Sequence, residues 1–86
     1  MAFVGVDGIS VDAGLTTYHE VEAQTNLHLI RRAARTVVVA DGSKVGRRAL
    51  ARIAALDDVG ELITDCSADP AELARLADAG IVVTTV

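Results

Sequence analysis

Acidic side chains, and in one place a lysine, follow the apolar segments of this sequence. Asp7-Gly8 follows the first apolar run, Asp41-Gly42-Ser43-Lys44 follows a second, and Asp65 follows a third. An ammonium group supplies positive charge, while a serine hydroxyl and loop N–H groups supply hydrogen-bond donors for an anion. These residue types could therefore hold the hydroxyls and the phosphate of a small anionic ligand. Asp41 and Ser43 could equally do no more than cap a turn.

Asn26 and Glu22 are candidates for the same site because both belong to a segment with helical periodicity. Asn26 shares the apolar face of that segment with Ala23, Leu27 and Ile30. A buried amide is costly unless it is hydrogen-bonded, so Asn26 either bonds a neighbouring strand end or lines a site. Glu22 lies one turn earlier and could reach the same space. It could also be a solvated first-turn carboxylate that the helix dipole favours.

The sequence offers little support for metal or nucleophilic chemistry. His19 and His28 are nine residues apart, too far to share one helix face as a ligand pair, and no cysteine joins them. No G-x-G-x-x-G, Walker A or nucleophile-elbow motif is present. Ser43 has no evident histidine partner, and no catalytic signature surrounds Cys66. We therefore expect no metal, no cofactor and no nucleophilic catalysis.

Length and composition narrow the class of protein. The chain has 86 residues, of which 51% are hydrophobic, which predicts one small folded domain rather than disorder. No apolar run approaches the roughly 18 residues that cross a bilayer, and the N-terminal segment lacks the basic residues of a secretory signal. The single cysteine, Cys66, excludes an internal disulfide and fits the reducing cytoplasm, where we expect the protein.

The formal net charge of −4 argues against a nucleic-acid surface on this chain. The nearest approach to a basic cluster is the group Arg31, Arg32 and Arg35. These three residues are most simply explained as the solvated face of a helix end, where cations suit the helix dipole.

The apolar segments predict several short strands. We expect strands at 2–6, 36–40, 61–64 and 81–86, and a loop at 8–15. Residues 49–55 are ambiguous between strand and helix, and we favour a strand. The unbroken β-branched run from Thr36 indicates a strand covered on both faces, as in a parallel sheet.

Two segments predict helices. Thr17 and Glu20 have capping-box spacing, so the first helix should run from about Tyr18 to Arg35. Its expected buried face consists of Ala23, Asn26, Leu27, Ile30, Ala33 and Ala34. The second helix should have Asp69 as N-cap, Pro70 in first position, Glu72 completing a capping box and Gly80 as its stop. Leu73, Leu76 and Ala77 should point at the core.

Alternation of strands and helices indicates an α/β domain with a mainly parallel sheet and flanking helices. Ligands bind such sheets outside the carboxyl ends of the strands, where Asp7 and Asp41 are expected to lie. The first strand begins at residue 2 with no element before it to cover its face. We therefore expect residues 1–86 to form a single partial domain of a larger unit.

Five segments, taken in order along the chain, resemble the sensor domain of DeoR-type transcriptional regulators. Gly8-Ile9-Ser10, Gly14-Leu15-Thr16-Thr17 and Glu22-Ala23 resemble the middle of that domain. The stretch from Val37 to Gly46 resembles its D-x-S-K-x-G element, and Leu62-Ile63-Thr64-Asp65 resembles its later I-T-D. The resemblance covers nearly the whole chain in consistent order and spacing.

The resemblance implies the C-terminal half of an effector-binding domain, similar to half of a ribose-5-phosphate isomerase or CoA-transferase-like domain. Regulators of this type join an N-terminal winged helix-turn-helix to a sensor that binds phosphorylated sugars or related metabolites. DNA would thus be bound only through a helix-turn-helix domain absent from this chain. Sensors of this family are commonly oligomers, so we expect a homo-oligomer and no membrane association.

The resemblance also implies which residues contact the effector. Asp7-Gly8, Asp41 and Lys44 match an Asp-Gly and the D-x-S-K Asp and Lys of the related isomerases. The glutamate base of those enzymes falls near Asn26, which cannot take a proton. The predicted ligand-binding set is Asp7, Gly8, Glu22, Asn26, Asp41, Ser43 and Lys44.

Three functions remain open at this point. The favoured hypothesis is a non-catalytic, effector-binding fragment of a transcriptional repressor. The second is a sugar-phosphate isomerase-like enzyme, which would need Glu22 as its base. The third is a structural α/β module that associates through bare apolar strand faces.

Overall fold

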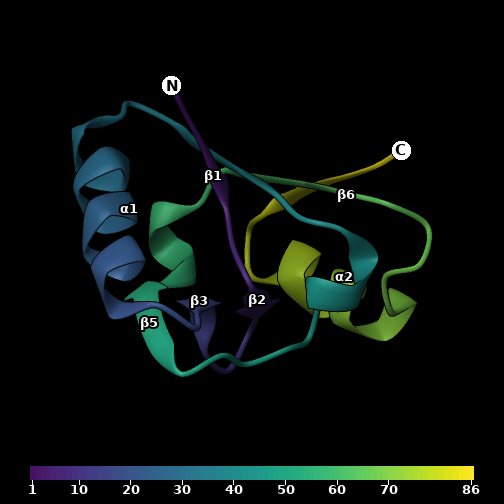
Figure 1. Ribbon diagram of the computed structural model, residues 1–86. Helices are drawn as coiled ribbons and strands as arrows, with labels where there is room; N and C mark the ends of the chain where they lie inside the picture. The colour runs from purple at the N-terminus through teal and green to yellow at the C-terminus, as the bar shows by residue number, and fades with distance from the viewer.

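The β-branched segments form a four-stranded sheet, here called sheet A, in the computed structural model, which describes residues 1–86 (Figure 1). Its strands, in spatial order, are β1 (Ala2–Gly5), β4 (Thr36–Val39), β6 (Glu61–Thr64) and β7 (Val82–Thr85). All three neighbouring pairs are parallel, so the carboxyl ends of the four strands lie at one edge. The predicted strands and the α/β fold with a mainly parallel sheet are confirmed.

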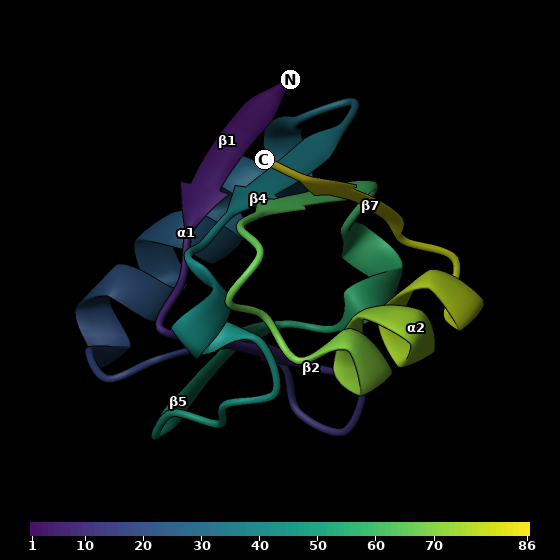
Figure 2. The ribbon, with the colours of Figure 1, turned by 90° about the vertical axis from the view of Figure 1, so that its right-hand side faces the viewer.

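Elements of this chain cover only one face of sheet A (Figure 2). The register places Val4, Val38 and Leu62 side by side on this inner face, and all three are buried. On the opposite, outer face, Phe3 is 65% exposed and Val39 is 47% exposed, whereas Val37 between the neighbouring strands is only 3% exposed. The prediction that β4 is covered on both faces is therefore wrong for Val39, because both α-helices lie on the inner side of the sheet.

A second, antiparallel sheet includes residues that were predicted to form a loop. This sheet B consists of β2 (Gly8–Ser10), β3 (Gly14–Thr17) and β5 (Ala51–Ala54), in that spatial order. The loop prediction for residues 8–15 is wrong, whereas the strand favoured within 49–55 is confirmed. The strands of this sheet are too short for a clear alternation, and β3 pairs with a strand distant in sequence. Local periodicity therefore could not indicate the hairpin.

The first helix, α1 (Glu20–Arg32), is shorter than the predicted span of 18–35. His19 precedes it without a side-chain cap. The Thr17 hydroxyl donates to Asp7 and accepts from the His19 N–H at 3.4 Å rather than from the Glu20 N–H, so no capping box forms. At its other end the backbone turns extended at Ala33. The predicted inner residues divide into three groups: Ala23 and Ile30 are buried, Asn26, Leu27 and Ala33 are half-buried, and Ala34 is exposed.

The second helix, α2 (Pro70–Asp78), begins and ends as predicted. The Asp69 carboxylate accepts a hydrogen bond from the Ala71 N–H at 3.2 Å, and Gly80 follows the helix with a φ of 101°. Glu72 does not complete a capping box, because its carboxylate accepts from the distant Val11 N–H at 3.0 Å. Of the residues predicted to point inward, Leu76 is buried, Leu73 is half-buried against the core, and Ala77 is exposed.

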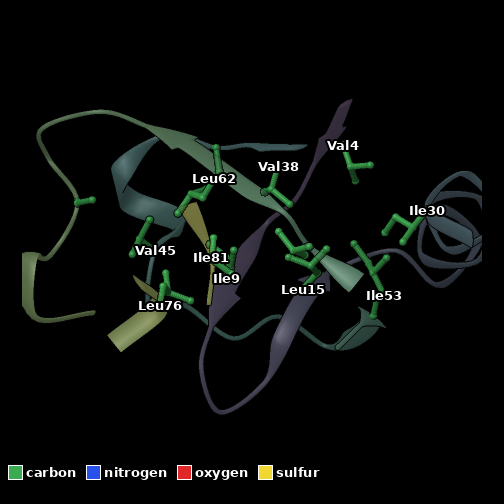
Figure 3. Close-up of a cluster of buried hydrophobic side chains, with 14 of the residues drawn as sticks. Val4, Ile9, Leu15, Ile30, Val38, Val45, Ile53, Leu62, Leu76 and Ile81 are labelled. Carbon is green, nitrogen blue, oxygen red and sulfur yellow. The ribbon is translucent and has the colours of Figure 1, made fainter. Parts of the chain in front are cut away.

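The hydrophobic core fills the space between the inner face of sheet A and a layer formed by sheet B and the two helices. Figure 3 shows the side chains of Val38 and Leu62 on one side of this space and Ile9 and Leu15 on the other. Ile30 of α1 and Leu76 of α2 close it at the two flanks. Neither helix is long and apolar enough to span a bilayer.

Thr64 provides a test of this packing, because its buried hydroxyl has no hydrogen-bond partner among the protein groups. Thr64→Val removes that unpaired hydroxyl and keeps a similar side-chain shape. We expect the free energy of unfolding to rise by about 1 kcal/mol. For a domain of this size the melting temperature should rise by roughly 4–8 °C, measured by circular dichroism.

The matched control is Thr17→Val, since the Thr17 hydroxyl is bonded to Asp7 at 2.9 Å and its loss should lower the melting temperature. A lower melting temperature for Thr64→Val would show that its hydroxyl is satisfied in solution and would contradict this account.

Candidate functional site

A polar pocket of about 330 Å³ lies at the carboxyl ends of β1 and β4. Helix α1 contributes to one side, and η1 (Gly42–Lys44), a single turn of 3-10 helix, contributes to the other. Five of the seven predicted ligand-binding residues line this pocket, namely Asp7, Glu22, Asn26, Asp41 and Lys44. The parallel sheet thus brings together residues from three separate segments of the chain.

The two remaining predicted residues, Gly8 and Ser43, do not line the pocket. Gly8 is buried in β2, where an added Cβ would lie 2.3 Å from the Arg47 carbonyl oxygen. Its lack of a side chain therefore permits a close backbone approach. Ser43 directs both its N–H and its hydroxyl to the Asp41 carboxylate, so it holds the turn together.

Asp7 is held at the end of β1 by two donors from the segment before α1. Its Oδ2 accepts from the Tyr18 N–H at 3.1 Å and from the Thr17 hydroxyl at 2.9 Å. The Tyr18 N–H, and then the Thr17 hydroxyl, keep the pKa of Asp7 below its ordinary value of 3.8, and the positive charges of Lys44 and His19 act in the same direction. Asp7 is therefore ionised at neutral pH, with one oxygen fixed by the protein.

Asp41 has a similar arrangement at the end of β4. Its Oδ1 accepts from the Ser43 hydroxyl and from the Ser43 N–H, and these bonds lower the pKa of Asp41. The Gly42 N–H donates to the Asp65 carboxylate at 3.1 Å. Both the Ser43 donors and the Gly42 N–H, which the sequence offered as anion-binding groups, are thus bonded to carboxylates of the protein.

Lys44 is consequently the cation that the pocket offers to a ligand. It is half-buried and takes part in none of the chain's three ion pairs. The rest of the polar lining consists of the carboxylates of Asp7, Asp41 and Glu22 and the amide of Asn26. Chemically, the pocket presents many acceptors for hydroxyl groups and one positive charge for an anion.

Sequence reasoning missed two kinds of residue in this site. Gly5, Val6, Val39 and Ala40 line the pocket as the last residues of β1 and β4 and those that follow them, and their residue types carry no chemical signal. Thr17 fixes the Asp7 carboxylate, although its spacing to Glu20 had indicated a helix cap. No local signal in the sequence indicates the contact from Thr17 to Asp7, because it depends on the pairing of β2 with β3.

Comparison with known proteins finds one matching family and several similar transcriptional regulators. The family model described as DeoR C terminal sensor domain matches residues 1–66. The chain is 36% identical over 83 residues to the HTH-type transcriptional regulator GlpR of Haloferax volcanii, covering 96% of this chain and 32% of that protein. It is 35% identical over 86 residues to the putative aga operon transcriptional repressor of Escherichia coli O157:H7, covering 100% and 32%.

A third relative is the glycerol-3-phosphate regulon repressor of Haemophilus influenzae, which is 36% identical over 61 residues, covering 71% of this chain and 24% of that protein. The chain spans about a third of the length of the first two of these relatives.

The hydrogen bonds to the Asp7 carboxylate predict how this group titrates at acid pH. Folding lowers the pKa of Asp7 from 3.8, so the ionised Asp7 carboxylate stabilises the folded state fully above pH 3.8. This stabilisation is lost as the pH falls through the lowered pKa. In Thr17→Val one donor to Asp7 is gone, so the titration midpoint of the Asp7 carboxyl should rise toward 3.8. Carboxyl ¹³C NMR measures this midpoint directly.

Thr25→Val is the matched control, because the Thr25 hydroxyl bonds the Val21 carbonyl on exposed α1 and has no link to Asp7. The Asp7 midpoint should be unchanged in this variant. An equal midpoint in the wild type and in Thr17→Val would contradict the role assigned to Thr17.

Proposed function

This chain belongs to the family of DeoR C-terminal sensor domains, and we propose that it binds a phosphorylated sugar or a related small anionic metabolite without converting it. The observation that carries this proposal is the convergence of Asp7, Asp41 and Lys44 on one pocket at the carboxyl edge of sheet A. We further propose that residues 1–86 are a partial domain of a longer cytoplasmic repressor, which contacts DNA through a separate helix-turn-helix domain.

The free carboxylate oxygens suit the hydroxyl groups of such a ligand. Asp7 bonds protein donors through Oδ2 and Asp41 through Oδ1, so each keeps its other oxygen for a ligand hydroxyl. Bonds to an ionised acceptor are roughly twice as strong as neutral ones. Because the surrounding carboxylates repel a phosphate, the phosphate must contact Lys44 closely to bind here.

The protonation states of Asp7 and Asp41 disfavour a role as general acids. Asp7 and Asp41 have lowered pKa values, so at neutral pH neither carries a proton that it could donate. Asn26 occupies the pocket wall without a titratable group. Glu22 also lines the pocket, and it is the residue on which the alternative, an isomerase-like enzyme, would depend.

Isothermal titration calorimetry of the chain with a panel of sugar phosphates and glycerol 3-phosphate tests the proposal. We expect at least one member to bind. Lys44→Gln should weaken that binding about tenfold or more, since a hydrogen bond to a charged group contributes about 1.5–3 kcal/mol. Asp41→Ala should weaken it in the same direction.

Arg48→Gln is the control for Lys44→Gln, because it also removes one positive charge but from an exposed residue outside the pocket. Its affinity should match that of the wild type. Binding that no pocket variant changes would refute the proposal. Turnover of an aldose phosphate that Glu22→Gln abolishes would establish the isomerase alternative instead.

The outer face of sheet A supports a second proposal, that the protein is a homo-oligomer. Phe3, Val39 and Val82 are exposed on this face, and parallel sheets are ordinarily covered on both sides. The charge of Glu61 within the face is already compensated, because its two oxygens accept from Arg35 at 3.0 Å and from Thr84 at 2.9 Å. A second copy could therefore cover the face without burying an unpaired charge.

Light scattering of the chain over a range of concentrations tests this association. Val82→Asp places an unpaired charge on the outer face, where Val82 is 56% exposed, and should shift the protein toward monomer. Val21→Asp is the control, because Val21 is 79% exposed on α1, away from sheet A. A wild type that stays monomeric at all concentrations would contradict association through this face.

A further inference from the structure

We infer that Asp65 is a positioning residue for Lys44, although Asp65 does not line the pocket that Lys44 enters. Asp65 follows β6, and its Oδ1 accepts a hydrogen bond from the Gly42 N–H at 3.1 Å. Gly42 is the first residue of η1, and Lys44 is the last. The inference rests on the proposed function, since it assigns how that site holds its cation in place.

The Asp65 carboxylate is itself oriented by its own loop. The same Oδ1 accepts from the Ser67 N–H at 2.9 Å and from the Ser67 hydroxyl, and these bonds together with the Gly42 N–H lower the pKa of Asp65. The carboxylate is therefore ionised and fixed before it reaches across to the neighbouring strand end. A bond from an N–H to an ionised carboxylate is among the stronger hydrogen bonds in proteins.

Gly42 also lies directly against the loop that follows Asp65. A Cβ added to Gly42 would lie 2.2 Å from the Ala68 N and 2.3 Å from the Ser67 Oγ. This close approach explains why glycine stands at the start of the turn. It also shows that the loop after β6 packs against the first residue of η1.

The turn that carries Lys44 needs such support, because it is only three residues long. Within it, the Lys44 N–H donates to the Asp41 carbonyl at 3.0 Å, and one turn of 3-10 helix is not stable by itself. After Lys44, the Gly46 N–H donates to the Ile9 carbonyl at 2.7 Å. Two backbone hydrogen bonds to other segments thus flank Lys44: the Gly42 N–H bonds Asp65 before it, and the Gly46 N–H bonds Ile9 after it.

The consequence for binding is specific. Lys44 is the pocket's only cation, so its place determines where the anionic part of a ligand can sit. Without the bond from Gly42 to Asp65 the turn loses its first anchor, and the backbone from which the Lys44 side chain extends is held less firmly. Asp65 should therefore matter for the anion that Lys44 binds even though it makes no contact with that anion.

A readout without ligand is available because Lys44 is the single lysine of the chain. Reductive methylation with ¹³C-formaldehyde keeps its charge and labels only Lys44 and the N-terminal amine. In Asp65→Ala we expect the Lys44 methyl signal to move toward that of a free dimethyl-lysine, and the Gly42 amide to exchange faster with solvent. Asp65→Asn keeps an oxygen acceptor for Gly42 and should restore most of the wild-type signal.

The second readout is affinity for glucose 6-phosphate, used as the probe, or for the tightest binder of the panel. Asp65→Ala should weaken binding about fivefold or more, and Asp65→Asn should weaken it less. In the Lys44→Gln background, Asp65→Ala should cause no further loss, because two residues that act through one group are not additive. A residue with a merely structural role would weaken binding equally in both backgrounds.

Asp69→Ala is the matched control. It removes another aspartate of the same loop, whose carboxylate caps α2 through the Ala71 N–H and has no bond to η1. This variant should lower the melting temperature and leave both the Lys44 signal and the affinity unchanged. If Asp65→Ala does not fold, Asp65→Glu, which displaces the carboxylate by one methylene, provides the same comparison.

The outcomes separate the two claims. An unchanged Lys44 signal and unchanged Gly42 exchange in the folded Asp65 variant overturn the positioning role, whatever the affinity. Failure of the wild type to bind any sugar phosphate refutes the proposed function, and the labelled lysine then decides the role of Asp65 on its own.

Discussion

The backbone ladder between β1 and β4 is the constraint on which the site depends. The two strands pair in parallel from Ala2↔Thr36 to Gly5↔Val39, so they end at the same level of sheet A. Asp7 and Asp41 follow these ends and consequently line one pocket. An antiparallel pairing would have sent the two carboxylates to opposite edges of the sheet. The chemistry of the pocket is thus a result of strand direction before it is a result of any side-chain contact.

The aspartates that follow the strands of sheet A are all held by hydrogen bonds from the protein. Asp7, Asp41 and Asp65 each accept hydrogen bonds from nearby protein donors, which orient the carboxylate and lower its pKa. The site thus has oriented, acidic carboxylates and one cation, Lys44, whose side chain extends from the anchored turn η1. The pocket at the strand ends and the apolar outer face of sheet A meet at Val39, which lines the pocket and is 47% exposed on that face.

Much of the fold follows from local signals in the sequence. The β-branched run of β4 predicted a strand of a parallel sheet, and Asp69, Pro70 and Gly80 predicted both ends of α2. These predictions succeed because a strand buried in the middle of a sheet and a capped helix each require particular residue types at particular positions. The same logic predicted that Asp7 and Lys44 lie at one edge of sheet A, and both line the pocket there, because parallel strands share one carboxyl end.

The tertiary structure alone decided which partner each polar side chain takes. Thr17 has capping-box spacing to Glu20, yet its hydroxyl donates to Asp7. Glu72 has the same spacing to Asp69, yet its carboxylate accepts from the Val11 N–H, 61 positions away. The strand β3 likewise pairs with β5, which is distant in sequence. The sequence by itself determined the strands of sheet A, the two helices and five of the polar residues that line the pocket. Only folding determined the hydrogen bonds among them, because a side chain with several possible partners bonds the one that packing brings within reach.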